Sequence, residues 1–442
     1  MSHNLNIKLS FSSILRFAFP SILMMVVMSL YTSVDGAFVS KLIGTDAMSA
    51  INIVYPFFSL MIGLGTMFGS GITAIISTKM GEGKQAEANQ SFTFIIFFTI
   101  VIGFFLSVLT FIFLDKIIYF LGANEAIFQY CYDYAYPLVF FCIANVLQYQ
   151  FQSVYIANGK PYVGLISTLI GGIFNIIFDY YFIAILNMGI RGAALATGLG
   201  YLIPTIFGLW YFSSKKHGNI YFVKPSFDFK VLINTMSNGS SEMVSYLSTS
   251  ITTFLFNLIL MRLVGQEGVA SISILLYLDF ILVAIIMGYS MGVAPLFSFS
   301  HGSNQTDRIN KLFKTSVLFC TITGISMTLI TLLFASQLTQ IFTIPGSAVY
   351  DLSVTALSIF GFSYLFKGYN IFSSAMFTAF GNGLVSATLS FMRTLVFLVV
   401  TLLLFAYLFK TTGVWLATPI AELLSLGLAL YFTKKYRTQY QY

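Results

Sequence analysis

The chain has 442 residues, of which 57% are hydrophobic and only 8% are charged, and its formal net charge is +7. Soluble domains contain about 45–50% apolar and about 25% charged residues. The composition therefore excludes an ordinary soluble protein and indicates an integral membrane protein.

Twelve apolar stretches are long enough to cross a bilayer core of about 30 Å, which needs roughly 20 helical residues. Helices are favoured over a β-barrel because barrel strands would appear as alternating segments of about ten residues. No small-residue cleavage pattern follows Arg16, so we interpret the first stretch as a permanent span. In chain order, the expected spans are 14–39, 51–78, 91–113, 129–156, 161–185, 193–212, 232–261, 270–299, 313–334, 352–377, 384–408 and 413–433.

The basic residues are distributed unequally between the two sides of these spans. If the spans alternate, 15 of the 22 Lys and Arg residues fall on one side and 5 on the other, while Lys367 and Arg393 lie inside spans. Basic loops mark the cytoplasmic side. The positive charge therefore predicts a topology with both termini in the cytoplasm, rather than a nucleic-acid partner.

The sequence repeats itself at an offset of 221 residues, which is half of its length. Each half carries six spans, so the two halves would enter the membrane in the same direction, as in secondary transporters whose substrate sites lie between parallel repeats. We expect a first six-helix bundle at 1–213, a cytoplasmic linker at 214–230 and a second bundle at 231–442. The glycines that keep the offset are Gly44 and Gly265, Gly71 and Gly292, Gly81 and Gly302, and Gly192 and Gly413.

Ionisable and polar residues inside the first-half spans are the main functional candidates. Charge within a membrane is costly and is usually functional, and Asp35 and Asp179 correspond to Phe256 and Val400 at the repeat offset. Asn175 and Asp179 are four residues apart and share a helical face. They predict a pocket for a hard cation such as sodium, or for a proton.

Two further residues carry open interpretations. Thr197 could add a ligand oxygen, but Thr418 repeats it, so a hydroxyl that only links helices is the better interpretation of Thr197 alone. Glu242 is either a second acidic site that attracts a cationic substrate or a surface residue solvated near the cytoplasm. Asp279 and Glu422 also fall within spans and could neutralise Lys367 or Arg393.

Other features point to transport driven by an ion gradient. No G-x-x-x-x-G-K-[ST] sequence is present, and His3, His217 and His301 lie in the tail or in loops, which disfavours ATP binding and a membrane-embedded enzyme. Pro20 would interrupt the hydrogen bonds of the first span and is a candidate hinge. Aromatic rings could line a cavity for flat organic cations.

The order and spacing of several motifs resemble the multidrug and toxic compound extrusion (MATE) family over nearly the whole chain. They are an aspartate late in the first span, an Asn-x-x-x-Asp pattern in the fifth, a Gly-Ala-Ala-Leu-Ala-Thr sequence opening the sixth, and Gly-Glu-Gly-Lys after the second. In this sequence they fall at Ser33–Gly36, Asn175–Asp179, Gly192–Thr197 and Gly81–Lys84.

The resemblance implies a V-shaped pair of six-helix bundles that exports varied, often cationic, organic compounds in exchange for Na⁺ or H⁺. It implies a coupling-ion site at Asp35, Asn175, Asp179 and Thr197, with Glu242 as the counterpart of a second acid on the seventh helix. The tenth helix has Lys367 and no acid, which departs from members that place an acid there.

We therefore expect a monomeric, multi-pass antiporter of a bacterial inner membrane that acts in multidrug efflux and antibiotic resistance, without a cofactor other than its coupling ion. The alternative is a flippase for lipid-linked precursors. That function would need a basic cavity for an anionic cargo, for which Lys367 and Arg393 are the candidates.

Overall fold

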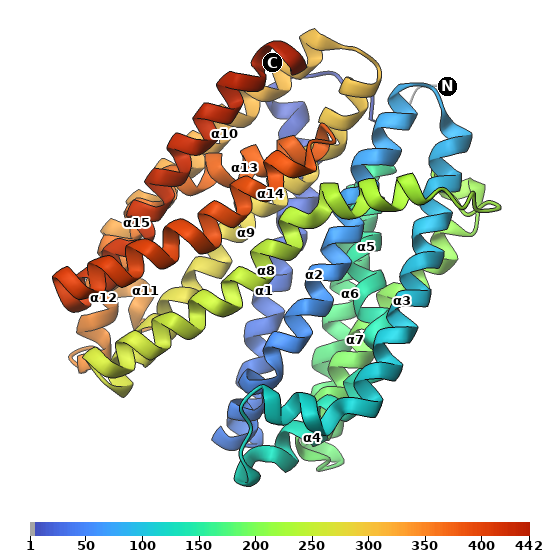
Figure 1. The fold of residues 1–442 in the computed structure, drawn as a ribbon. Coiled ribbons are helices and arrows are strands. Elements are labelled where there is room, and N and C mark those ends of the chain that lie inside the picture. Colours follow the sequence, from blue (N-terminus) through green and yellow to red (C-terminus); the bar gives the residue numbers. More distant parts are fainter. Residues whose placement is uncertain (1–4) are drawn as a thin grey trace.

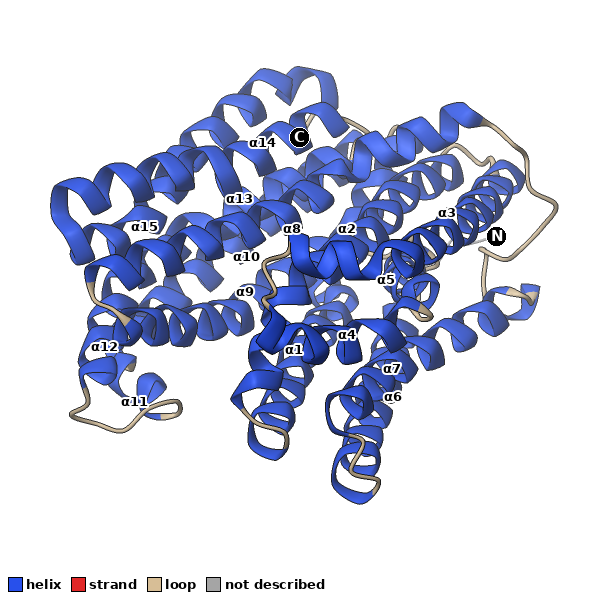
Figure 2. Ribbon diagram, turned by 60° about the horizontal axis from the view of Figure 1, so that its bottom comes forward, coloured by secondary structure: helices blue, strands red, loops and turns tan. Residues whose placement is uncertain are grey.

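The computed structural model describes residues 5–442, and among these the side chains of 32–38, 40, 41 and 45 lie outside the described set. The described residues form helices and no strands (Figure 2). Apolar runs in lipid must satisfy their backbone hydrogen bonds internally, and a helix does so within one segment.

The first half of the chain forms seven α-helices and a π-helical segment. Their bounds are α1 Phe11–Leu42, α2 Thr45–Gly81, α3 Gln85–Phe120, α4 Glu125–Val139, α5 Cys142–Ala157, α6 Pro161–Asp179, η1 Tyr180–Ile185 and α7 Gly189–Phe212. A short 3₁₀ turn, η2 Lys215–His217, follows in the connection to the second half.

The second half repeats this organisation with more interruptions. Its elements are α8 Phe229–Leu263, α9 Gln266–Gly302, α10 Thr306–Leu333, α11 Ala335–Gln340, α12 Ala348–Phe360, η3 Gly361–Ser363, α13 Tyr364–Ala379, α14 Gly383–Phe391, η4 Met392–Phe397 and α15 Leu398–Tyr440.

The helices agree with the twelve expected crossings. Among the described residues, 10 segments are long and apolar enough to span a membrane. One further crossing is divided into α4 and α5, which are separated just beyond Pro137. The twelfth crossing lies in the segment Gly383–Tyr440, which is counted as one helix but contains two crossings. The helix is interrupted at Lys410, where φ is 51°. The red ribbon of α15 turns back on itself in this region (Figure 1).

The hydrophobic core shows how the two halves are joined. One large cluster combines residues of both halves, for example Phe68 and Phe151 with Phe297 and Phe372. Two other clusters are confined to one half each, within 39–194 and within 256–417. The helices converge at the end of the molecule where both termini lie and diverge toward the other end (Figure 1). The result is a V-shaped pair of bundles.

Glycines that keep the repeat offset lie at the closest approach of the halves. A side chain at Gly81 of α2 would collide with the backbone of Phe299 in α9, and one at Gly302 of α9 would collide with the backbone of Thr78 in α2. Gly302 follows Gly81 by 221 positions, and Phe299 follows Thr78 by the same number. The two contacts are therefore equivalent. Only a glycine lets the two backbones come this close.

The connection between the halves is held against the first half. Lys160 Nζ donates a hydrogen bond to the His217 carbonyl at 2.6 Å, and the Asn158 side-chain oxygen accepts from the backbone N–H groups of Asn219 and Ile220 at 2.9 and 3.1 Å. The bundle boundaries expected from the sequence, 1–213, 214–230 and 231–442, stay a prediction.

Candidate functional site

Asn175 and Asp179 lie in the last turns of α6, where both side chains are buried. Asn175 is 3% exposed and Asp179 is 0% exposed. Their spacing of four residues places them on one helical face, as the sequence predicts. Thr197, on α7, is 9% exposed.

Contacts between α6 and α7 bring these residues to the same level. A Cβ added at Gly200 would lie 3.1 Å from Asn175 Cβ, and one added at Gly192 would lie 3.0 Å from Cβ of Phe182, which lies in η1, the segment that continues α6. The two helices are therefore antiparallel neighbours in a fixed register. Between these two contacts, Thr197 lies level with the α6 acid.

The first helix packs against α6 in parallel. A Cβ at Gly164 would lie 3.4 Å from Met24 Sδ, and one at Gly172 would lie 3.4 Å from Tyr31 Cδ1. Asp35 follows Tyr31 by four residues in the sequence. Its side chain lies outside the described residues, so the contacts of this acid stay a prediction.

Two side-chain oxygens near Asp179 accept no hydrogen bond from the described residues. Asn175 Oδ1 and Thr197 Oγ1 are enclosed and have no hydrogen-bond partner among the described residues. Buried polar atoms normally have a partner. A hard cation favours several oxygen ligands, and carboxylate, amide and hydroxyl oxygens are all supplied by α6 and α7.

A π-helical segment, η1, begins directly after Asp179. Segments of this kind occur often at functional sites, because the wider turn changes the direction of neighbouring side chains and leaves backbone groups available. The acid thus lies at a local break in the regular helix rather than within a uniform one.

Glu242 lies inside a span and not at its start. It is the fourteenth residue of α8, which begins at Phe229, so at a rise of 1.5 Å per residue it is about 20 Å from the helix start. Its side chain is half-buried. The guanidinium of Arg393 lies near its carboxyl, and these positions favour the internal acidic site over the solvated surface residue.

Arg393 belongs to a buried network at the core of the second half. Its Nη1 donates to Glu422 Oε1 at 3.2 Å, and Asn370 Nδ2 donates to Glu422 Oε2 at 2.7 Å. The side chain of Glu422 is 6% exposed and that of Arg393 is 17% exposed. Buried charges need partners of this kind.

The other internal base is paired as well. Lys367 Nζ lies 2.8 Å from Asp279 Oδ1, and the lysine side chain is 6% exposed. Both bases that could have lined a cavity for an anionic cargo are therefore bonded to carboxylates.

A group of tyrosines gathers between the halves, which the composition could not single out. The hydroxyls of Tyr31 and Tyr55, from α1 and α2, lie near that of Tyr246 in α8, which also lies near Glu242. The hydroxyl of Tyr149 in α5 lies near these three hydroxyls as well. With 26 tyrosines in the chain, only the tertiary structure identifies the ones that meet.

The helix α5 carries a run of buried amides that sequence reasoning missed. They are Asn145, Gln148, Gln150 and Gln152, all at most 5% exposed. Gln152 donates to Thr168 of α6 at 3.2 Å, whereas both amide atoms of Asn145 and of Gln150 lack a partner among the described residues. The sequence did contain a signal for this polar helix, since four amide side chains fall within eight residues of an otherwise apolar run.

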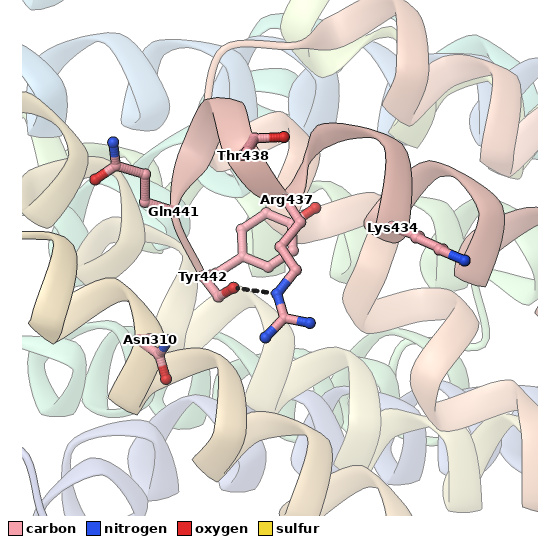
Figure 3. A pocket seen from close by; sticks show the side chains of 6 residues that line it. All are labelled: Asn310, Lys434, Arg437, Thr438, Gln441 and Tyr442. Atoms are coloured by element: carbon pink, nitrogen blue, oxygen red, sulfur yellow. Dashed lines mark hydrogen bonds between the residues drawn. The ribbon is translucent and has the colours of Figure 1, made fainter.

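Two surface pockets lie away from these residues. One, at the end of the molecule where both termini lie, is lined by Asn310, Lys434, Arg437, Thr438, Gln441 and Tyr442 (Figure 3). There Arg437 Nε donates to the main-chain oxygen of Tyr442 at 3.2 Å, and the Tyr442 hydroxyl donates to the Thr433 carbonyl at 2.8 Å. Burial raises the pKa of the Tyr442 hydroxyl. The other pocket lies beside Arg191 and Tyr132.

Within the described part of the chain, no three His, Cys, Asp or Glu side chains gather as metal ligands. The three cysteines, Cys131, Cys142 and Cys320, are free and buried. A cation site in the first half would therefore rely on amide and hydroxyl oxygens beside the carboxylates.

Comparison with known proteins gives consistent results over the full length. The family model MatE matches residues 20–181 and 243–425. A multidrug export protein MepA of Staphylococcus haemolyticus is 26% identical in an alignment 444 residues long, which covers 97% of this chain and 94% of that protein. MepA of Staphylococcus aureus (strain MRSA252) is 24% identical, covering 93% and 91%.

Solved structures share the fold. An outward-facing MATE family transporter of the MOP superfamily matches with a TM-score of 0.91 at 21% identity, over 97% of this chain and 96% of that one. A MOP superfamily transporter from Pyrococcus furiosus, described as having a binding pocket of reverse polarity, matches with a TM-score of 0.90 at 22% identity and the same coverage.

Proposed function

Since the chain belongs to the MatE family, whose matched relatives are multidrug export proteins, we propose that this multidrug efflux transporter is an antiporter that exports organic, often cationic, compounds in exchange for Na⁺ or H⁺. The buried Asp179, one helical turn from Asn175 and level with Thr197 in the first half, is the observation that carries the proposal. Charge at such a position in a membrane is maintained by function.

The coupling ion binds at Asp35, Asn175, Asp179 and Thr197. The contacts of α1 with α6 support the inclusion of Asp35, because one more helical turn beyond Tyr31 reaches the level of Asn175. The Asn175 and Thr197 oxygens, which have no hydrogen-bond partner among the described residues, provide neutral ligands for a sodium ion or acceptors for a protonated carboxyl.

The organic substrate binds between the halves. Tyr55 and Tyr246, from opposite halves, offer ring faces that attract organic cations, and the Glu242 carboxyl lies near the Tyr246 hydroxyl. Flat cations would be recognised by area and charge rather than by a fixed pattern of hydrogen bonds, which suits varied substrates.

Exchange follows from reciprocal binding in two states. The halves share a core at one end and separate at the other (Figure 1). Rocking of one half against the other around a site between them, which separates the shared end as the open end closes, would expose that site to alternate sides. Ion binding in the first half, with a change in α1 near Pro20, lowers the affinity for drug, and drug lowers the affinity for the ion by the same factor. Both termini lie in the cytoplasm of a bacterial cell, and the protein acts as a monomer.

The flippase alternative loses its main support. An anionic cargo requires unpaired basic groups facing the cavity, whereas Lys367 and Arg393 are engaged by Asp279 and Glu422.

Gradient-driven transport in everted membrane vesicles tests the proposal. Uptake of ethidium is measured with a sodium gradient and with a pH gradient imposed separately. Asp179→Asn and Asp35→Asn each remove a membrane carboxylate, and we expect transport to fall by at least about tenfold. Asp133→Asn, in an ion pair at the end of a span, is the matched control. Wild-type rates in Asp179→Asn would contradict the assignment.

A further inference from the structure

Lys367 is the most enclosed ammonium group of the described residues, and its surroundings are unusual. Its Nζ lies 2.8 Å from Asp279 Oδ1. The same atom lies 4.7 Å from the ring centroid of Phe360 and 5.3 Å from that of Tyr364. One ammonium is thus held by one carboxylate and two aromatic rings.

These are the groups that proteins use to bind free organic ammonium ions. Ring faces attract a cation most strongly where water is excluded, and a carboxylate completes the charge. Phe360 is 3% exposed and Tyr364 is 0% exposed, so both rings are shielded from water, whereas the Asp279 side chain is 21% exposed. The arrangement is a cation-binding box whose cation belongs to the chain itself.

The box is built by contacts that do not involve the lysine. Phe360 ends α12, the 3₁₀ turn η3 follows, and Tyr364 opens α13, so that the two rings meet edge to face with centroids 6.0 Å apart. Thr328 of α10 donates to the Gly361 carbonyl at 3.0 Å and holds the turn. Asp279 comes from another helix, α9.

Glu422, another internal acid of the second half, lies in a separate network, in which it is hydrogen-bonded to Arg393 and Asn370. The Asp279 carboxylate is therefore the only acid that the described contacts assign to Lys367. Removal of the lysine would leave one negative charge facing two rings.

We propose that Lys367 is a tethered cation that fills a site formed by Asp279, Phe360 and Tyr364, and that this site takes a small primary alkylammonium ion once the lysine side chain is removed. In the native protein the lysine keeps free cations out of this part of the second half. The lysine thereby confines coupling-ion binding to the first half, a step that rests on the proposed function.

The test uses the ligand that replaces the missing atoms. Lys367→Ala removes Cγ, Cδ, Cε and Nζ, which correspond to n-propylammonium. Binding of n-propylammonium to the purified full-length protein in detergent is measured by calorimetry and by the shift in melting temperature. Wild type, Lys367→Ala and the double variant Asp279→Asn/Lys367→Ala are compared, with n-propanol as the uncharged control ligand.

We expect saturable binding and a raised melting temperature for Lys367→Ala only, with affinity for the double variant at least about tenfold weaker because the counterion is lost. n-Propanol should have no effect. If Lys367→Ala is recovered in folded form only when n-propylammonium is present, this rescue also supports the site. Absence of both binding and rescue, or equal binding to the double variant, would overturn the proposal.

The measurement requires no transport. If n-propylammonium binds to Lys367→Ala but Asp179→Asn shows normal efflux, the cation-binding box is supported and the proposed coupling site is wrong. If Asp179→Asn loses efflux but Lys367→Ala does not bind n-propylammonium, the coupling site is supported and the box is wrong.

Discussion

The two halves of this molecule share one architecture but treat charge differently. In the second half, two ion pairs, Asp279 with Lys367 and Glu422 with Arg393, lie within the spans. In the first half, the ion pairs of the described residues lie at or beyond span ends, and the buried Asp179 has the amide of Asn175 one turn away on its helix.

The positions of these charges were not part of the duplicated scaffold. At the offset of 221, Lys367 and Arg393 correspond to Val146 and Gly172, and Glu422 corresponds to Tyr201. The glycines at the crossing of α2 and α9 are present in both halves. Duplication thus preserved the residues that backbone packing requires, while the ionisable residues diverged, and we infer that the halves became specialised.

The largest expected effect is on the second half's buried network. Arg393→Met leaves Glu422 without its counterion, and we expect the free energy of unfolding to fall by about 3–5 kcal/mol. Thermal unfolding in detergent measures it. Arg393→Met/Glu422→Gln removes both charges and should recover most of the loss. An unchanged melting temperature in the single variant would show that the pair is not a structural element of this half.

Next in size is the crossing that the halves share. Gly81→Val would place methyl groups against the backbone near Phe299, and overpacking of this kind costs about 1–3 kcal/mol. Gly302→Val should cost a similar amount, because its contact with Thr78 is equivalent. Gly427→Val is the control, since no atom lies within 4 Å of its added Cβ. Unequal effects at Gly81 and Gly302, measured by thermal unfolding, would break the symmetry of the crossing.

The repeated threonines separate function from packing. Thr197→Ala removes a hydroxyl of the proposed coupling site. We expect ethidium efflux to fall by about tenfold, which corresponds to the free energy of about one hydrogen bond. Thr418→Ala removes the corresponding buried hydroxyl of the second half and should leave efflux unchanged. Equal losses in the two variants would return Thr197 to a role in helix packing.

The smallest effect is expected at the exposed ion pair of the first half. Arg191 Nη2 lies 2.7 Å from Asp133 Oδ1, but the arginine side chain is 57% exposed. Arg191→Gln should change the free energy of unfolding by less than about 1 kcal/mol. A loss as large as that of Arg393→Met would mean that ion pairs contribute alike to the stability of the two halves.

Much of the fold could be predicted because the bilayer restricts the choices. The apolar runs indicated twelve crossings, and the offset of Gly81 and Gly302 indicated the duplication. The breaks within crossings were less accessible. Pro137 marks the division of α4 from α5, but nothing in the sequence around Lys410 reveals the left-handed backbone that ends one crossing and starts the next.

The candidate site was only partly accessible from the sequence. The spacing of Asn175 and Asp179 fixes a shared helical face, and the cost of charge in lipid drew attention to both acids. The pairing of Lys367 with Asp279 rather than with another acid could not be predicted, because the two residues are 88 positions apart and the helix rotations that bring them together depend on packing. The choice of Tyr55 and Tyr246 among many tyrosines was hidden for the same reason.

The sequence by itself determined that the chain spans a membrane with two similar halves, because hydrophobic length and internal repetition act locally along the chain. Only the tertiary structure decided which charges neutralise each other, which rings face one another, and where the halves meet. Those outcomes depend on the register and rotation of neighbouring helices, which are set by contacts such as Gly172 with Tyr31 and Gly81 with Phe299 between residues far apart in sequence.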